Sequence, residues 1–224
     1  MTLPKAVVFD LDGTLADTRL DIAAACNHAL TSVGRQAKTV DEVVAFVGDG
    51  SRVLVARALG LPEDDAVTAT AFASFSAYYA AHAADHATWM RGAREALEAC
   101  EHAGVQLALA TNKPRSATLP LLDALGITAR FKVVVAGGDG PLKPDPASIR
   151  AAVGPLGVPP EAAWVVGDGP QDIGAGRAAG AWTVAVLGGF AQEAALREAG
   201  PHYVLESLAG FAALLRASGT TEWA

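Results

Sequence analysis

Short, continuous apolar runs recur along the chain and predict buried strands. They lie at residues 6–10, 105–111, 132–136, 163–167, 182–187 and 202–205. Such runs are rich in valine and do not alternate with polar residues, which is typical of parallel strands covered on both faces. Helix-length segments separate the later runs, at 115–125, 146–156, 172–179 and 192–199. This alternation predicts an α/β fold with a Rossmann-like, largely parallel sheet.

The spacing of the strands is irregular at one place, because residues 11–104 separate the first two runs. A crossover between parallel strands needs only about a dozen residues, and long loops without structure are uncommon. Apolar residues at helical spacing fill part of this interval. They are Ile22, Cys26, Ala29, Leu30 and Val33, then Val53, Ala56 and Leu59, then Phe72, Phe75 and Tyr79. We therefore predict an inserted helical bundle at 16–85, over a core formed by residues 1–15 and 86–224.

Two further expectations concern the bundle and the end of the chain. We interpret the aromatic stripe of Phe72, Phe75, Tyr78 and Tyr79 as bundle core rather than as ligand contacts. We expect residues 219–224 to form a frayed tail.

Composition narrows the class of protein. Hydrophobic residues make up 51% of the 224 residues, which excludes a disordered chain. The net charge of −7 argues against a general nucleic-acid binder or a binder of anionic membranes, although a local basic site remains possible. We expect a monomer or homodimer with no nucleic-acid or membrane partner.

The two cysteines and the length of the apolar runs bear on the compartment. Cys26 and Cys100 lie in apolar helical patterns without metal-ligand spacing, so we expect buried, reduced thiols. No apolar run approaches the ~18 residues of a membrane-spanning helix, and the run at 6–9 is too short for a signal peptide. A cytoplasmic location follows as an expectation.

Two aspartates follow the first predicted strand. Alternation along an extended backbone places Asp10 and Asp12 on the same side, where their charges repel unless a cation lies between them. The pair suits acid–base chemistry or a hard, oxygen-liganded metal such as Mg²⁺. A calcium loop of the EF-hand type is excluded, because the sixth position from Asp10 is Leu15 and not glycine.

Three more strand ends carry polar side chains. Thr111 and Asn112 precede a predicted helix, where they could cradle an anion or simply cap the helix. Lys143 follows the third strand beside prolines, a setting that is also typical of a solvated loop. Asp168 and Asp172 add two carboxylates after the fourth strand. Because the carboxyl ends of parallel strands meet at one edge of a sheet, we expect these residues to converge on one polar site.

The glycines at 174–180 superficially resemble a dinucleotide-binding fingerprint. Their spacing is G-x-G-x-x-x-G, and they lie within a predicted helix instead of at a strand-to-helix turn. Close packing of the helix is the better interpretation.

The four strand-end motifs, in this order, resemble those of the haloacid dehalogenase superfamily in its phosphatase branch. They are residues 10–14 (Asp-Leu-Asp-Gly-Thr), Thr111, Lys143 and residues 167–172 (Gly-Asp-Gly-Pro-Gln-Asp). The resemblance spans residues 6 to 187 and implies that the helical insertion is the mobile α-helical cap domain of that superfamily. True dehalogenases lack an acid at the position of Asp12, so the resemblance implies a Mg²⁺-dependent phosphatase.

The resemblance also implies roles for the candidate residues. Asp10 would be the nucleophile, forming an aspartyl-phosphate, and Asp12 would be the general acid and base. The Asp10 carboxylate, the Asp12 backbone carbonyl and Asp168 would bind Mg²⁺, with Asp172 behind them or bound through water. The residues expected to bind the phosphoryl group are Gly13, Thr111, Asn112 through its backbone, and Lys143.

Two positions depart from the superfamily pattern. Gly169 stands where many members have serine, and Pro170 and Gln171 replace a more usual polar or charged pair. Both acidic residues of that motif are retained, so we expect tuning of the site and not its loss.

The helical insertion bears on the substrate. Residues 47–59 are similar to the glycine-rich loop and helix of phosphoglycolate phosphatases, which implies a small phosphorylated metabolite, 2-phosphoglycolate, as substrate. Arg52 could contact the substrate carboxylate or remain a surface arginine. The alternatives are a sugar-phosphate phosphatase, a phosphoglucomutase-like phosphotransferase and a non-catalytic phosphate-binding protein. A phosphonate hydrolase would need a lysine in the insertion, for which Lys38 is the only candidate.

Overall fold

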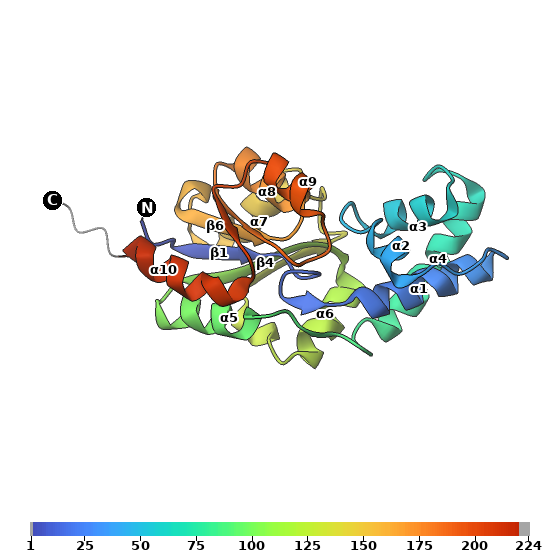
Figure 1. Ribbon diagram of the computed structural model, residues 1–224, viewed down its shortest axis with the longest axis horizontal. Coiled ribbons are helices and arrows are strands. Elements are labelled where there is room, and N and C mark those ends of the chain that lie inside the picture. The colour runs from blue at the N-terminus through green and yellow to red at the C-terminus, as the bar shows by residue number, and fades with distance from the viewer. Residues whose placement is uncertain (1, 220–224) are drawn as a thin grey trace.

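A six-stranded parallel sheet with helices on both faces forms the larger part of the molecule (Figure 1). The computed structural model describes residues 2–219, so residues 220–224 of the predicted tail lie outside the described residues, and Gly219 ends the last helix. The α/β class predicted from the alternation of strands and helices is confirmed. In spatial order the strands are β5 (Val133–Gly137), β4 (Gln106–Pro114), β1 (Ala6–Phe9), β6 (Ala163–Gly167), β7 (Trp182–Val186) and β8 (Tyr203–Leu205).

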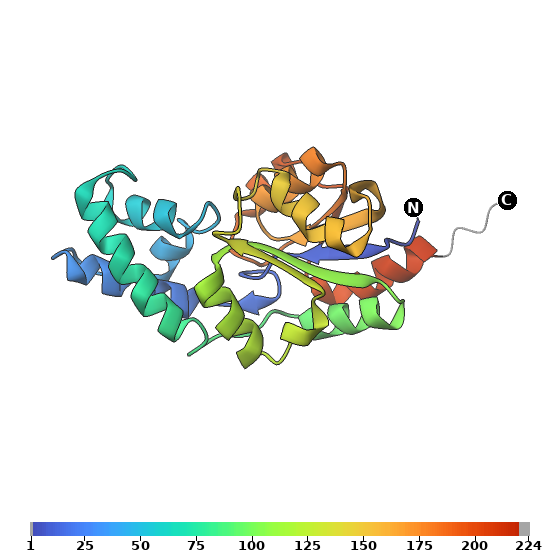
Figure 2. The ribbon, with the colours of Figure 1, turned by 180° about the vertical axis from the view of Figure 1, so that it is seen from behind.

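Alternate residues of the central strand β1 face two different helical layers, which Figures 1 and 2 show from opposite sides. Val7 and Phe9 belong to a hydrophobic cluster with the helices of one layer, and Ala6 and Val8 belong to a second cluster on the other face. Both faces of β1 are therefore buried, which explains its unbroken apolar run. The first layer contains α5 (Ala93–His102), α6 (Arg115–Ala124) and α10 (Phe211–Gly219), and the second contains α7 (Ala147–Val153) and α8 (Pro170–Ala179), with α9 (Glu193–Glu198) beside α8.

Four helices form a separate bundle beyond the carboxyl edge of the sheet, at the right of Figure 1. We call them the helical insertion. They are α1 (Arg19–Ser32), α2 (Val40–Val44), α3 (Ser51–Leu59) and α4 (Ala66–His82), packed around their own hydrophobic cluster. Two short antiparallel strands, β2 (Ala16–Asp17) and β3 (Thr88–Trp89), join the insertion to the sheet, and the sequence did not predict them. The boundaries of the two domains at residues 16 and 85 stay a proposal.

Local signals fix where the helices of the insertion begin and end. Helix α2 begins at a capping box, in which Thr39 Oγ1 accepts a hydrogen bond from Glu42 N and the Glu42 carboxylate accepts one from Thr39 N. Asp65 caps α4 by accepting a hydrogen bond from the backbone N–H of Val67. Helix α3 ends at Gly60, whose φ of 67° suits glycine.

The predicted apolar face of α3 is confirmed for Ala56, which is buried, and for Leu59, which packs against the hydrophobic cluster of the insertion, whereas Val53 is only half-buried. The buried face also includes Leu54, Val55 and Ala58, which the spacing did not single out. Six of the nine residues of α3 are apolar and residues 53–56 are consecutive, so periodicity alone does not choose its buried face.

The glycines of α8 pack closely against the sheet, as the sequence analysis expected. A Cβ on Gly176 would lie 2.6 Å from Thr183 Cγ2 and 3.0 Å from Val165 Cβ. Helix and strands therefore approach to a distance that only glycine allows.

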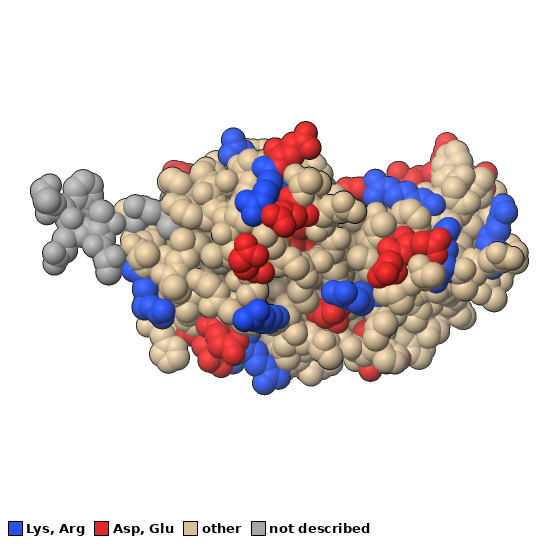
Figure 3. All heavy atoms as spheres, in the orientation of Figure 1, with Lys and Arg blue, Asp and Glu red and all other residues tan. Residues whose placement is uncertain are grey.

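Both cysteines are free and buried, as predicted, and burial raises the pKa of Cys26 to about 11 and that of Cys100 to about 12. Within residues 2–219, none of the helices has the length and apolarity that crossing a bilayer requires. On the face drawn in Figure 3, acidic and basic side chains are interspersed.

Replacement of Phe211 by alanine should lower the free energy of unfolding by about 3–5 kcal/mol, because a fully buried ring is lost from the core. The ring centroid of Phe211 lies 5.5 Å from that of Phe9 and 6.1 Å from that of Trp164. Urea unfolding of the purified variant measures the change. The control, Leu20→Ala on the exposed side of α1, should change stability by less than about 0.5 kcal/mol. Equal losses in both variants would contradict the packing described.

Candidate active site

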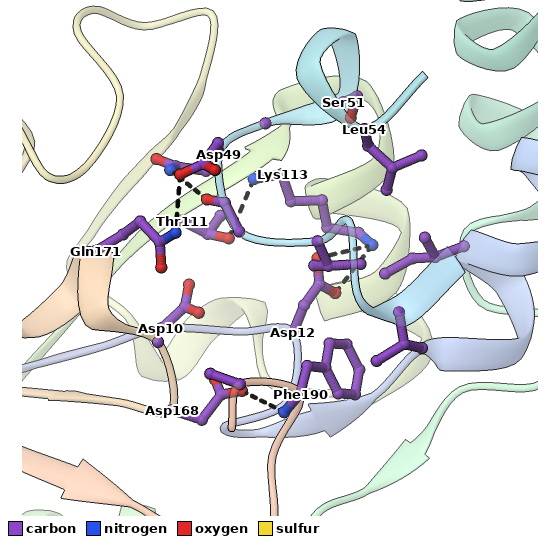
Figure 4. Close-up of a pocket in the computed structure, with 18 of the residues that line it drawn as sticks. Asp10, Asp12, Asp49, Ser51, Leu54, Thr111, Lys113, Asp168, Gln171 and Phe190 are labelled. Atoms are coloured by element: carbon purple, nitrogen blue, oxygen red, sulfur yellow. Dashed lines mark hydrogen bonds and ion pairs between the residues drawn. The ribbon is translucent and has the colours of Figure 1, made fainter. Parts of the chain in front are cut away.

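A cavity of about 500 Å³ lies between the carboxyl edge of the sheet and the helical insertion (Figure 4). The sheet side contributes Asp10 and Asp12, which follow β1, and residues 111–113 at the end of β4. Lys143 and residues 168–172 line it as well. The insertion contributes the loop at 47–50 and side chains of α3 and α4. The convergence of the four strand ends is therefore present in the structure.

Three carboxylates meet on the sheet side of the cavity. Asp10, Asp168 and Asp172 each offer an oxygen, and these three oxygens lie within 4.8 Å of one another. The ammonium group of Lys143 joins two of them, at 2.8 Å from Asp10 Oδ1 and 2.5 Å from Asp172 Oδ1. It also donates a hydrogen bond of 2.6 Å to the backbone oxygen of Ala110. Lys143 is thus a partner of the carboxylates and not a solvated loop residue.

Burial shifts the protonation of this cluster. Burial, together with the charges of Asp172 and Asp168, raises the pKa of Asp10 to about 8, although Lys143 opposes the shift. Burial and the charge of Asp172 raise the pKa of Asp168 to about 6. Burial alone would lower the pKa of Lys143, but Asp10 and Asp172 outweigh it and raise that pKa. These raised pKa values reflect three carboxylates with a single lysine to offset their negative charge.

The chemistry of the cluster fits a hard divalent cation. Its ligand atoms are carboxylate oxygens, the type that such cations prefer. Three carboxylates face one lysine, so a cation would offset the remaining negative charge. The side chain of Asp12 is not part of this group.

Asp168 is held in place by neighbours from two other segments. Its Oδ1 accepts a hydrogen bond of 2.7 Å from Thr14 Oγ1, and its Oδ2 accepts one of 2.7 Å from the backbone N–H of Phe190. Gly13 leaves the space for this arrangement, because a Cβ there would lie 2.3 Å from Asp168 Oδ2 and its φ is +79°. Gly13 thus shapes the site by being small. The sequence analysis did not single out Thr14 or Phe190, although Thr14 ends the first motif.

Asp12 faces the insertion side of the cavity. Its Oδ1 accepts hydrogen bonds of 2.7 Å from Thr18 Oγ1 and 3.0 Å from Lys113 Nζ. Lys113 also donates to the hydroxyl of Tyr79, which comes from α4. Burial lowers the pKa of Lys113 and raises that of Tyr79.

The sequence pattern did not single out Lys113, and it assigned Tyr79 to the core of the insertion alone. Lys113 directly follows Thr111 and Asn112 at the same strand end, and this position was the available signal. Tyr79 lies in the core of the insertion, as predicted for the aromatic stripe, yet Tyr79 and Phe75 also line the cavity. Phe75 and Tyr79 therefore satisfy both interpretations of the stripe, as core residues and as residues that line the cavity.

Asn112 connects three segments of the chain. Its Nδ2 donates to the backbone oxygens of Gly48, at 2.8 Å, and of Lys143, at 2.9 Å, while its Oδ1 accepts from the backbone N–H of Lys143 at 2.8 Å. Helix α6 starts after Pro114 without a side-chain cap, so the capping alternative for Thr111 and Asn112 is wrong. Thr111 lines the cavity.

Gly169 and Gln171, which depart from the superfamily pattern in the fourth motif, are in close contact in the structure. Gln171 Nε2 donates a hydrogen bond of 2.8 Å to Asp49 Oδ1 in the insertion, and Arg57 holds the other oxygen of Asp49 at 2.5 Å. A Cβ on Gly169 would lie 2.8 Å from Gln171 Oε1. Glycine at 169 therefore gives Gln171 room to reach the insertion.

Arg52 does not line the cavity, so its expected contact with the substrate is not supported by its position. Its Nε and Nη2 donate to the backbone oxygen of Glu63 at 3.1 and 2.8 Å, and its guanidinium lies 5.5 Å from the centre of the Phe72 ring. Arg52 is therefore a surface arginine, the second of the two positions that the sequence left open. Lys38 does not line the cavity either.

Comparison with known proteins agrees with the site. A family model described as haloacid dehalogenase-like hydrolase matches residues 7–186. Phosphoglycolate phosphatase 1 of Pseudomonas aeruginosa is 37% identical over 213 residues, covering 92% of this chain and 78% of that protein. The phosphoglycolate phosphatase of Rhodospirillum rubrum is 38% identical over 200 residues, covering 85% of this chain and 83% of that protein. The solved structure of a predicted phosphoglycolate phosphatase from Haemophilus somnus has a TM-score of 0.86 at 28% identity, covering 96% of this chain and 99% of that chain.

The match to the family model takes in every strand end that contributes to the cavity. It begins within β1 and ends with β7, so it includes the helical insertion as well as the three clustered carboxylates and Lys143. The chain belongs to the haloacid dehalogenase-like hydrolase family.

Proposed function

We propose that this chain is a Mg²⁺-dependent phosphatase that hydrolyses a small phosphate monoester, 2-phosphoglycolate, to glycolate and inorganic phosphate. The observation that carries the proposal is the cluster of Asp10, Asp168 and Asp172 around Lys143, on the sheet side of the cavity. The names of the relatives support the choice of substrate. The enzyme would act in the cytoplasm, in keeping with its two free cysteines, as a monomer or homodimer.

The first chemical step uses Asp10 and Asp12. A carboxylate oxygen of Asp10 attacks phosphorus, and the bond between phosphorus and the ester oxygen breaks. Asp12 gives a proton to the departing oxygen, so the alcohol leaves neutral and Asp10 carries the phosphoryl group. Thr18 and Lys113 hold Asp12 on the insertion side of the cavity, where the organic part of the substrate would lie.

The second step reverses the role of Asp12. It takes a proton from a water molecule whose oxygen attacks the phosphorus of the aspartyl-phosphate. The bond between phosphorus and Asp10 breaks, which releases inorganic phosphate and restores both carboxyl groups. The same two residues therefore suffice for both steps.

The remaining residues of the cavity orient the phosphoryl group. Asp10, Asp168 and the backbone carbonyl of Asp12 would hold Mg²⁺, which when bound offsets the negative charge of the carboxylates and of the phosphoryl oxygens. Lys143 and Thr111 line the cavity beside Asp10 and would contact those oxygens. Without these positive groups, an anionic substrate could not approach three carboxylates.

Among phosphate esters, 2-phosphoglycolate should have the highest kcat/KM. The cavity of about 500 Å³ would also admit a hexose phosphate, so size alone does not exclude that class. Phosphate release from 2-phosphoglycolate, hexose phosphates and a phosphonate, compared under the same conditions, measures the preference. A preference for a hexose phosphate would refute the substrate and leave the proposed chemistry standing.

Replacement of Asp10 by asparagine should lower kcat by about 10³-fold or more, because the amide is a poor nucleophile. The side chain stays nearly the same size, so the fold should be kept. Steady-state phosphate release measures the loss, with Asp64→Asn on the exposed surface of the insertion as the matched control. Metal-dependent turnover that survives in Asp10→Asn would show that another group attacks phosphorus.

Mg²⁺ should stabilise the protein more at about pH 8 than at about pH 5.5. The pKa values of Asp10, about 8, and Asp168, about 6, lie above the ordinary value of 3.8, so the folded state keeps protons that the unfolded state loses. Without a cation, stability therefore falls as pH rises through this range. A bound cation competes with these protons, so its stabilising effect grows with pH.

The increase in Tm on adding Mg²⁺, measured at both pH values, checks this expectation. The variant Asp10→Asn should show a smaller dependence on pH, because one of the two titrating groups is gone. An increase in Tm that is the same at both pH values in the unmodified protein would contradict the expectation.

A further inference from the structure

Three cationic side chains line the cavity, and they differ in how fully their donors are used. Lys143 has three N–H donors and three partners, namely Asp10, Asp172 and the backbone oxygen of Ala110. Arg57 is exposed and already pairs with a carboxylate, that of Asp49. Lys113 contacts Tyr79 and a single carboxylate, that of Asp12, whose two oxygens lie 3.0 and 3.4 Å from Nζ. The contact at 3.4 Å is longer than an ordinary N–H···O hydrogen bond. Among the described residues that line the cavity, Lys113 is therefore the buried cation with a donor that an added anionic partner could take.

The position of Lys113 relative to Asp12 matches the shape of a short, carboxylated ester. A proton donor must lie within hydrogen-bond reach of the oxygen that leaves. In 2-phosphoglycolate a single methylene group separates this oxygen from the carboxyl carbon, so a cation that binds the carboxylate must lie beside the proton donor. The Nζ atom of Lys113 lies 3.0 Å from Asp12 Oδ1 and 3.4 Å from Asp12 Oδ2. Figure 4 shows the two side chains pointing toward each other.

The surroundings of Lys113 hold its ammonium group at one point. Its side chain is fully buried, and its Nζ lies 4.2 Å from the centre of the Tyr79 ring, whose hydroxyl also accepts from it. Tyr79 belongs to the insertion, whereas Lys113 belongs to the sheet. In such a water-poor setting, a charge attracts an anion more strongly than it would at the surface.

We propose that Lys113, held by Tyr79 and Asp12, recognises the carboxylate of the substrate, and this inference rests on the proposed function. It makes the enzyme selective for phosphate monoesters that carry a carboxylate on the carbon next to the ester oxygen. Phosphate is held on the Lys143 side of the cavity and the carboxylate on the Lys113 side. Arg52, the candidate for this role from the sequence, lies outside the cavity.

The test compares two esters of similar size, 2-phosphoglycolate and ethyl phosphate, which lacks the carboxylate. The ratio of their kcat/KM values is the readout, for the unmodified protein and for Lys113→Met. Loss of a charged hydrogen bond should lower this ratio by about 30-fold or more, mainly through KM for 2-phosphoglycolate. Ethyl phosphate should be affected less, since it makes no contact with the lost charge.

Two further variants separate recognition from a structural effect. Lys113→Arg keeps the charge, so its ratio of kcat/KM for 2-phosphoglycolate to that for ethyl phosphate should be larger than the ratio for Lys113→Met. If the methionine variant fails to fold, the arginine variant is compared with the unmodified protein instead. Lys132→Met is the matched control, because Lys132 is exposed and its Nζ donates to Gln106 at the start of β4, away from the cavity. It should leave both substrates unaffected.

The outcomes distinguish this inference from the proposed function. If the unmodified protein hydrolyses 2-phosphoglycolate in preference to ethyl phosphate, and Lys113→Met lowers both activities by the same factor, Lys113 does not recognise the carboxylate. An unchanged ratio in both Lys113 variants overturns the inference in the same way. If the unmodified protein releases no phosphate from 2-phosphoglycolate, the proposed function itself has failed.

Discussion

The repulsion among carboxylates gathered at one edge of the sheet is the constraint on which the site depends. Parallel strands bring their carboxyl ends together, and three of the acidic residues found there have oxygens within 4.8 Å of one another. Lys143 offsets part of that charge through its contacts with Asp10 and Asp172. Thr14 and the backbone N–H of Phe190 hold Asp168 in its place. The sheet side of the cavity therefore carries more negative than positive charge, and an anionic substrate needs a further positive group there.

The opposite wall of the cavity depends on polar contacts between the sheet and the helical insertion. Asn112 donates to the backbone oxygen of Gly48, and Gln171 donates to Asp49. Lys113 reaches the hydroxyl of Tyr79. Each contact starts from a residue that lines the cavity on the side of the sheet. The placement of the insertion is therefore coupled to the strand ends that form that side of the cavity.

The sheet, and most of the residues on the sheet side of the cavity, could be predicted from the sequence for a simple reason. Buried parallel strands leave unbroken apolar runs, and the residues that follow such runs meet at one edge, so Asp10, Lys143 and Asp168 could be placed together without coordinates. The wall formed by the insertion could not be predicted in the same way. Tyr79 has the spacing of a core residue and is one, and nothing local reveals that its hydroxyl reaches Lys113. For Arg52 the sequence left a substrate contact and a surface position open, because the side of α3 on which it lies depends on how that short helix packs.

The pairing of β2 with β3 has a consequence for how proteins of this architecture diverge. The chain leaves the sheet at Ala16 and Asp17 and returns at Thr88 and Trp89, so both ends of the insertion are held side by side. Once the ends of a segment are fixed together, its length has only a weak effect on the entropy of closing it. Insertions and sequence changes between these strands therefore cost the sheet little. Changes in the insertion can therefore reshape one side of the cavity while the strand ends on its other side are left as they are.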